Sequence, residues 1–138
     1  MSPGDADFHI TFWVKFTSLP ASQQLLVSKF ASSGNYEYAV YYANGDGHLY
    51  FIVSNNGTAT AQVQASTFGA VTTATWYFVE AYHDSANDVI GIGINGGTRD
   101  TLAHSTGVFG SAASFVIGAS GVPDQYTDGI IDAVGFFE

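Results

Sequence analysis

The chain has 138 residues, of which 46% are hydrophobic and only 11% are charged. Its formal net charge is −9, and its only lysine and arginine side chains are Lys15, Lys29 and Arg99, which argues against binding to nucleic acid phosphates or anionic membranes. Cysteine is absent, so a disulfide, a thiolate nucleophile and a thiolate metal site are excluded. We expect one domain over residues 1–138, with no membrane insertion and no signal peptide.

Apolar and polar side chains alternate with a period of two along most of the chain, whereas helical periodicity is nearly absent. In residues 8–16 the alternation separates Phe8, Ile10, Phe12, Val14 and Phe16 from His9, Thr11, Trp13 and Lys15. Short segments of the same kind, rich in aromatic and β-branched residues, follow at residues 25–30, 36–42, 48–54, 59–64, 75–83, 88–94, 98–103, 114–120 and 127–137. Each is predicted to be a β-strand.

Turns rich in asparagine and glycine separate these segments, at residues 44–47, 55–57 and 95–97. Asparagine and glycine tolerate positive φ angles, as tight hairpins require. Short strands joined by hairpins predict an all-β fold, an antiparallel β-sandwich or jelly roll.

An ordered set of motifs covers nearly the whole chain. The first is Phe-His-Ile-Thr-Phe-Trp-Val-Lys at residues 8–15, and the last is Gly-Ile-Ile-Asp-Ala-Val-Gly-Phe at residues 129–136. Between them, in order, lie the motifs at residues 26–29, 38–40, 47–51, 76–84, 92–96 and 117–118. In this order they resemble the laminin G-like jelly-roll domains of the concanavalin A-like lectin/glucanase superfamily, and the resemblance implies that fold.

Two departures from the family pattern concern the ends of the chain. The family has a further strand before residues 2–5, lying beside the closing strand, and continues past Phe136 and Phe137. The chain is therefore expected to be a module cut from a longer protein, or a compact variant that lacks the usual first strand. An exposed sheet edge is then expected near residues 127–137, where another chain can pair, including a second copy of this one.

Asp132 stands among apolar residues, and its alternation with Ile130, Val134 and Phe136 predicts that it shares their core-facing side. A buried carboxylate is costly unless it is hydrogen-bonded, paired or bound to a metal. We favour a structural clamp that accepts loop backbone N–H groups, with a calcium ligand second and a catalytic acid third. The jelly-roll glycosidases of this superfamily carry two Glu and an Asp alternating along one strand, a pattern that this sequence lacks.

Calcium is the one cofactor that the resemblance suggests, because many relatives bind it with rim carboxylates and backbone carbonyls. Such a site needs several oxygen ligands, commonly with two or more carboxylates. No segment has the spacing of a calcium-binding loop. The candidate ligands are Asp84, Asp128 and Asp132.

Aromatic side chains predicted to face away from the core are the most informative functional feature. Outward rings beside a carboxylate can form a platform on which sugars stack, with the carboxylate accepting a hydroxyl. The alternative is that these rings pack under loops or against a neighbouring subunit. The candidate ligand-binding residues are Tyr41, Tyr50, Phe78, Glu80, Tyr82 and Tyr126.

These observations favour a non-catalytic recognition module that binds a carbohydrate or a protein on a cell or virion surface. The alternative is a structural subunit of a virion, fibre or decoration layer, which recognises only its neighbours. The third hypothesis is a jelly-roll glycoside hydrolase. The parent protein is expected outside the cell, at the cell surface or on a virion, because surface polarity here comes from Ser, Thr, Asn, Gly and Gln.

Overall fold

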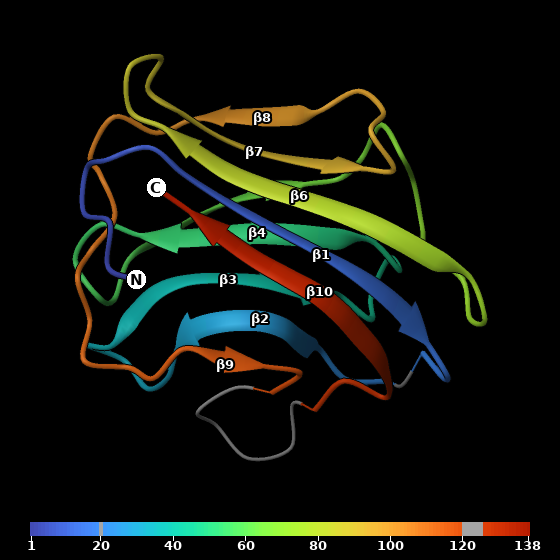
Figure 1. Ribbon diagram of the computed structural model, residues 1–138. Coiled ribbons are helices and arrows are strands. Elements are labelled where there is room, and N and C mark those ends of the chain that lie inside the picture. Colours follow the sequence, from blue (N-terminus) through green and yellow to red (C-terminus); the bar gives the residue numbers. More distant parts are fainter. Residues whose placement is uncertain (20, 120–125) are drawn as a thin grey trace.

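Two five-stranded antiparallel sheets packed face to face form the protein in the computed structural model, which describes residues 1–19, 21–119 and 126–138 (Figure 1). The strands are β1 (Phe8–Phe16), β2 (Gln24–Phe30), β3 (Tyr36–Tyr42), β4 (Leu49–Ser54), β5 (Thr60–Gln64), β6 (Trp76–Asp84), β7 (Val89–Ile94), β8 (Asp100–Ala103), β9 (Val116–Ile117) and β10 (Gly129–Phe137). The first sheet has the order β10-β1-β6-β7-β8, and the second has the order β5-β4-β3-β2-β9. The predicted antiparallel β-sandwich is confirmed.

Strand positions agree with the sequence patterns to within about two residues, except at 114–120, where only Val116–Ile117 is paired and residue 120 lies outside the described part. Among the residues that the structure describes, no helix is long and apolar enough to cross a membrane.

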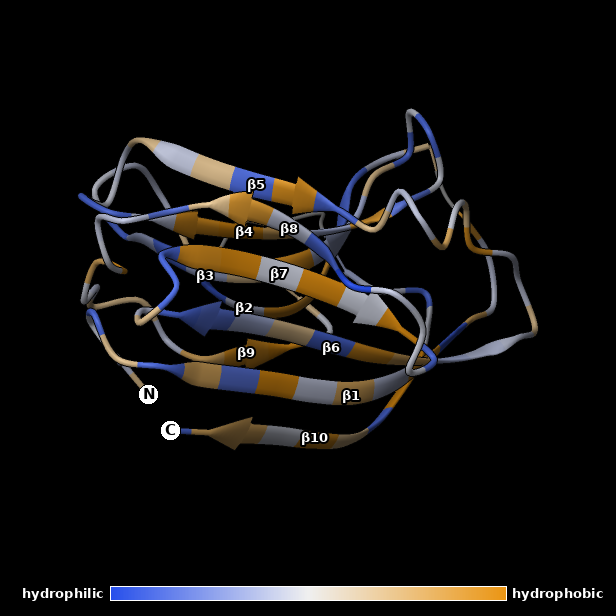
Figure 2. Cartoon of the chain, turned by 90° about the horizontal axis from the view of Figure 1, so that it is seen from above, coloured by the Kyte–Doolittle hydropathy of each residue, from blue (hydrophilic) through white to orange (hydrophobic). Residues whose placement is uncertain are grey.

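The core lies between the two sheets and follows the predicted alternation. In β1 the even-numbered residues from Phe8 to Phe16 are at most 3% exposed, and they pack against inward side chains of the second sheet. In β6 the inward positions are Tyr77, Val79 and Ala81. Figure 2 shows hydrophobic and hydrophilic segments alternating along β1 and β6. The residues between these core positions therefore point to the outer face of the first sheet.

A bulge in β10 overturns the prediction for Asp132. Thr11 is opposite Gly135 and Trp13 is opposite Asp132, so Ala133 and Val134 together face the single residue between Thr11 and Trp13. Ala133 adopts a φ of 50°, and the extra residue reverses the in-and-out alternation of the strand.

As a result, Ile131, Val134 and Phe136 pack against the core, while Ile130 and Asp132 are exposed. The prediction that Asp132 faces the core beside Ile130 was wrong. Asp132 also does not clamp a loop in the described structure, because its Oδ1 accepts the N–H of its own neighbour, Ala133, at 2.7 Å.

β10 is the outermost strand of the first sheet in the described part of the chain (Figure 1). The predicted sheet edge near residues 127–137 is therefore confirmed for Gly129–Phe137. Ile130 and Phe137 on this strand are 50% and 59% exposed. Pairing of this edge with another chain stays a prediction.

Asp100, at the start of β8, links the two sheets. Its carboxylate accepts the N–H of Thr67 at 2.9 Å, the Thr67 hydroxyl at 2.7 Å and the Ser66 hydroxyl at 3.0 Å, all from the turn after β5. Burial acts to raise the pKa of Asp100, but the hydrogen bonds from Thr67 and Ser66 outweigh it and hold the pKa below the ordinary value of 3.8.

We therefore expect the stabilisation by Asp100 to depend on pH. Because its pKa is lower in the folded state, the contribution is complete above the unfolded value of 3.8 and is lost as pH falls through the lower folded value. Urea unfolding should show Asp100→Asn to be less stable than the wild type by roughly 1 kcal/mol at neutral pH. The difference should shrink below pH 3.8. A difference that stays constant with pH would contradict this role.

Candidate functional site

The outer face of the first sheet gathers aromatic and polar side chains from β1 and β6. Because successive side chains of a strand alternate between faces, the residues between the core positions all point outward here. The two strands pair so that His9 lies opposite Tyr82, Thr11 opposite Glu80, Trp13 opposite Phe78 and Lys15 opposite Trp76. Each pair therefore places two outward side chains next to each other on the outer face of the sheet.

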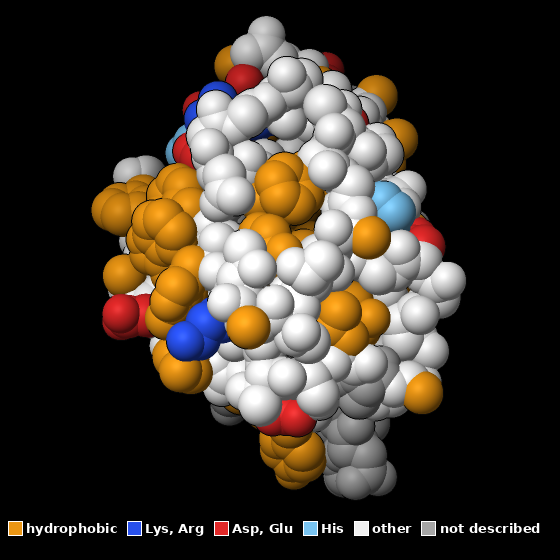
Figure 3. Space-filling model, turned by 90° about the vertical axis from the view of Figure 1, so that its right-hand side faces the viewer, with side chains coloured by type: hydrophobic (Ala, Val, Ile, Leu, Met, Phe, Trp, Pro, Cys, Tyr) orange, Lys and Arg blue, Asp and Glu red, His pale blue; other side chains and the backbone are white. Residues whose placement is uncertain are grey.

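At one end of this face, Trp13, Trp76 and Asp132 line an open pocket of about 320 Å³, here called the tryptophan pocket. Trp13 is 41% exposed and Trp76 is 40% exposed, although both stand on central strands of the sheet. Asp132 reaches the pocket from β10, directly opposite Trp13. Figure 3 views this end of the sandwich, and hydrophobic side chains gather along its left margin beside basic and acidic ones.

Neighbouring side chains fix the two indole rings. The Phe78 ring lies against Trp13, with centroids 5.3 Å apart and planes inclined by 47°. The Lys15 ammonium lies 5.1 Å from the centroid of the Trp76 ring, where the negative face of the indole attracts it. Both rings are therefore supported from one side and open to solvent on another.

The sequence interpretation missed Trp13 and Trp76 as candidate site residues. The signal for Trp13 was present, because the alternation in residues 8–16 already placed it opposite the core face. What the sequence did not provide was the strand register that brings Trp13, Trp76 and Asp132 to one pocket.

At the other end of the same face lies a second open pocket of about 420 Å³, here called the tyrosine pocket, with His9, Tyr82, Arg99 and Phe137 in its lining. The His9 and Tyr82 rings meet edge to face, with centroids 5.2 Å apart. The Arg99 guanidinium lies 5.5 Å from the centroid of the Tyr82 ring and donates to Glu80 Oε1 at 3.1 Å. Three predicted residues, Phe78, Glu80 and Tyr82, are thus neighbours on one face.

The other predicted aromatic residues lie elsewhere. Tyr41 and Tyr50 belong to the second sheet, on β3 and β4, and their rings stack with centroids 5.1 Å apart. Tyr41 is only 7% exposed and donates to Gln62 Oε1, and Tyr50 donates to Asp46 Oδ2. Burial raises the pKa of each of the two phenols to about 12. Tyr126 is 62% exposed and lies before β10.

Each of the three predicted calcium ligands accepts a hydrogen bond from another residue of the chain. Asp84 accepts the backbone and side-chain N–H groups of Asn87 in the turn after β6. Asp128 accepts the Ser18 hydroxyl at 2.5 Å, and Asp132 lines the tryptophan pocket. The described residues contain no cluster of three histidine or carboxylate side chains that could hold a metal ion. The calcium site stays a prediction without a ligand set.

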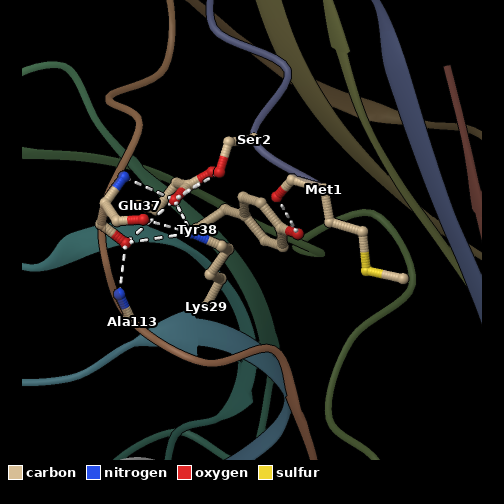
Figure 4. Close-up of polar contacts among 7 residues, drawn as sticks. Met1, Ser2, Lys29, Glu37, Tyr38 and Ala113 are labelled. Carbon is tan, nitrogen blue, oxygen red and sulfur yellow. Dashed lines mark hydrogen bonds and ion pairs between the residues drawn. The ribbon is translucent and has the colours of Figure 1, made fainter.

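The most buried carboxylate, Glu37, is closed to ligands (Figure 4). Its Oε2 atom accepts the Lys29 ammonium at 2.5 Å and both the N–H and the hydroxyl of Ser111, at 2.8 and 2.9 Å. Lys29 also donates to the carbonyl of Ser111 at 2.5 Å. Through Ser111, this ion pair attaches the connection between β8 and β9 to the second sheet. Its role is therefore structural.

Solved structures of similar fold include carbohydrate-binding and laminin domains. The CBM40 domain of the Ruminococcus gnavus IT-sialidase, bound to α2,3-sialyllactose, is 20% identical with a TM-score of 0.72, over 95% of this chain and 75% of that one. Domain 4 of AbnA, an extracellular GH43 arabinanase from Geobacillus stearothermophilus in complex with arabinotriose, is 20% identical with a TM-score of 0.69, over 99% of this chain and 64% of that one.

Domains LG4–5 of the mouse laminin alpha1 chain are 18% identical with a TM-score of 0.65, over 99% of this chain and 37% of that one. At these identities the likeness concerns the fold. Among curated proteins, no sequence matches the chain.

A family model supplies the classification. The model described as the concanavalin A-like lectin/glucanases superfamily matches residues 2–138, which is nearly the full chain. The match agrees with the ordered motifs in the sequence and with the two-sheet sandwich. The chain therefore belongs to the concanavalin A-like lectin/glucanase superfamily, with a laminin G-like domain.

Proposed function

We propose that this chain is a non-catalytic carbohydrate-recognition module whose ligand binds in the tryptophan pocket. The observation that carries the proposal is the pair of exposed indole rings, Trp13 and Trp76, beside the carboxylate of Asp132 in one open pocket. Large aromatic side chains that gather on an exposed surface often mark a binding site. Their exposure is what a sugar-binding platform requires.

The chemistry of the pocket suits a sugar ring. An indole face packs against the C–H groups of a pyranose or furanose, and a carboxylate oxygen accepts its hydroxyl groups. Asp132 uses one oxygen for the N–H of Ala133, and no described residue bonds its Oδ2. Because β1, β6 and β10 hold these side chains on one rigid sheet, little conformational entropy is lost on binding.

The non-catalytic part of the proposal rests on the number of acids in the pocket. Glycoside hydrolysis in most families uses two carboxyl groups that flank the scissile bond. In the described structure Asp132 is the only carboxylate lining the tryptophan pocket, while Glu80 is engaged by Arg99 and Glu37 is buried. A binding role needs no second acid.

The comparisons support the same proposal. Two of the similar structures are domains seen with an oligosaccharide, sialyllactose in one and arabinotriose in the other. Both are parts of glycan-degrading enzymes, and the arabinanase is an extracellular one. We accordingly place the parent protein outside the cell or on its surface, where it would hold glycans through several weak sites.

A structural or assembly role is the second candidate, and the edge strand β10 favours it. Its outward residues Ile130 and Phe137 are half exposed or more, and the strand has no partner on its outer side in the described part of the chain. Addition of a strand from another protein or a second copy would use that edge. On this reading the module would pack into a fibre or virion layer.

A glycan array tests the proposal, together with sedimentation of the unliganded protein. We expect selective glycan binding by the wild type and its loss in Trp76→Ala, because one of the two stacking surfaces is removed. Phe68→Ala, which removes another ring that is 40% exposed, should bind like the wild type. Running the array with calcium and with a chelator tests the calcium prediction. Concentration-dependent self-association without any glycan response would favour the assembly role.

A further inference from the structure

The tryptophan pocket and the tyrosine pocket lie in line on one face, along β1 and β6. We infer that the ligand is an uncharged, extended glycan that runs along these two strands and occupies both pockets. This inference rests on the proposed function and adds to it the chemical class and the length of the ligand. Its support comes from the register of the strands, from glycines beside the path and from the distribution of charge.

Because of the strand register, the two pockets lie at opposite ends of one path along β1 and β6. Along β1 the outward residues run from Trp13 through Thr11 to His9, and along β6 they run from Trp76 to Tyr82. At a rise of about 3.3 Å per residue, Trp76 and Tyr82 are roughly 20 Å apart along the strand. A single monosaccharide cannot contact both ends. A chain of several linked sugars can.

Glycines on the flanking strands let aromatic rings lie flat on the sheet. The Tyr82 ring lies across β7 over Gly91, where a Cβ would collide with its far end. The Phe137 ring lies over Gly135, where a Cβ would be 2.6 Å from that ring and 3.0 Å from the Thr11 hydroxyl. Both rings therefore lie close against the sheet at the tyrosine-pocket end of the face.

The middle of the path supplies polar groups suited to hydroxyls. Thr11 and Glu80 face each other there, and Glu80 accepts Arg99. Arg99 itself lies over Gly93, where a Cβ would be 3.0 Å from its Cγ. Between the two stacking surfaces, the Thr11 hydroxyl and the remaining donors and acceptors of the Glu80–Arg99 ion pair can hydrogen-bond sugar hydroxyls.

The charge distribution argues for a ligand without negative charge. The chain has three lysine and arginine residues and a net charge of −9. Lys29 is buried against Glu37, Arg99 is paired with Glu80, and Lys15 is drawn over the Trp76 ring. The lining of the first pocket includes Asp132, and that of the second includes Asp7, Asp84 and Glu138 alongside the paired Arg99. A carboxylated or sulfated glycan would be repelled here.

Affinity electrophoresis through gels that contain single polysaccharides tests the charge of the ligand. The neutral probes are arabinan, xylan, mixed-linkage β-glucan and galactomannan, and the anionic probes are polygalacturonate and polysialic acid. We expect retardation by at least one neutral polymer and by neither anionic one. Retardation by an anionic polymer, or by no neutral polymer, overturns the inference.

Calorimetry with short and long oligosaccharides of the retained polymer tests the length of the ligand. Tyr82→Ala should weaken binding of the long oligosaccharide by about tenfold and leave the short one unchanged, because only the long one reaches the second stacking surface. Gly91→Ala should act in the same direction by lifting the Tyr82 ring, which stays present. Tyr82→Phe, which keeps the ring, should bind like the wild type.

Variants of the two pockets separate the failure of this inference from failure of the proposed function. If Trp13→Ala abolishes binding while Tyr82→Ala and Gly91→Ala leave the long oligosaccharide unaffected, the ligand occupies only the tryptophan pocket and the inference is overturned. If a folded Trp13→Ala variant binds with unchanged affinity, the proposed function fails as well. Circular dichroism and the urea midpoint of each variant confirm that the sandwich is intact.

Discussion

Glu37→Ala is expected to lower the free energy of unfolding by about 3–5 kcal/mol, the cost of breaking a buried ion pair by removing one partner. Glu37 is fully buried, and its Oε2 is the acceptor for Lys29 and for Ser111. Without it, the Lys29 ammonium stays buried, and its remaining hydrogen-bond partners among the described residues are the carbonyl and hydroxyl of Ser111. Urea unfolding followed by tryptophan fluorescence measures the loss.

Two further variants separate the ion pair from simple packing. Replacing both partners, with Lys29→Met and Glu37→Leu together, should recover most of the lost stability, because no unpaired charge is left buried. The Oε1 atom of Glu37 is buried with no hydrogen-bond partner among the described residues. This lowers the net contribution of the ion pair to the free energy of unfolding. In contrast, Glu80→Ala breaks an exposed pair and should cost less than about 1 kcal/mol. A loss of that small size for Glu37→Ala would refute the buried-pair account.

Trp13→Ala is expected to weaken binding of the ligand by at least about 2 kcal/mol, roughly a 30-fold rise in Kd. Trp13 stands at the centre of the tryptophan pocket, with Asp132 opposite it on one side and Phe78 on the other. Its removal takes away a stacking surface beside the Asp132 carboxylate. Calorimetry with an oligosaccharide identified on the array measures the change.

The controls for this variant concern ring size and stability. Trp13→Phe keeps an aromatic face and should lose far less affinity than Trp13→Ala. Since Trp13 is 41% exposed, its truncation should move the urea midpoint much less than truncation of the fully buried Phe12 on the same strand. Unchanged affinity in a folded Trp13→Ala protein would remove the tryptophan pocket from the binding site.

Local patterns in the sequence identified the strands and the faces of β1 and β6 correctly. A strand gives successive side chains to opposite faces whatever its neighbours are, so the period of two alone placed Phe12 inward and Phe78 and Tyr82 outward. Asn-Gly turns are equally local. Asn95 and Gly96 both take positive φ in the turn after β7, as the turn chemistry requires.

Long-range pairing decided the features that local patterns got wrong or left open. The bulge at Ala133 depends on how β10 pairs with β1, and it turned Asp132 from an expected core residue into the wall of an exposed pocket. A single inserted residue reverses every side chain beyond it, and only the partner strand reveals that insertion.

By itself, the sequence determined the fold class, the strand positions and the sheet edge at the closing strand. Only the tertiary structure decided which outward residues meet: Trp13 with Trp76 and Asp132 on one sheet, and Tyr41 with Tyr50 on the other. The reason is physical. Alternation is a property of one chain segment, whereas a site is made where segments far apart in sequence are brought into register by the packing of a shared core.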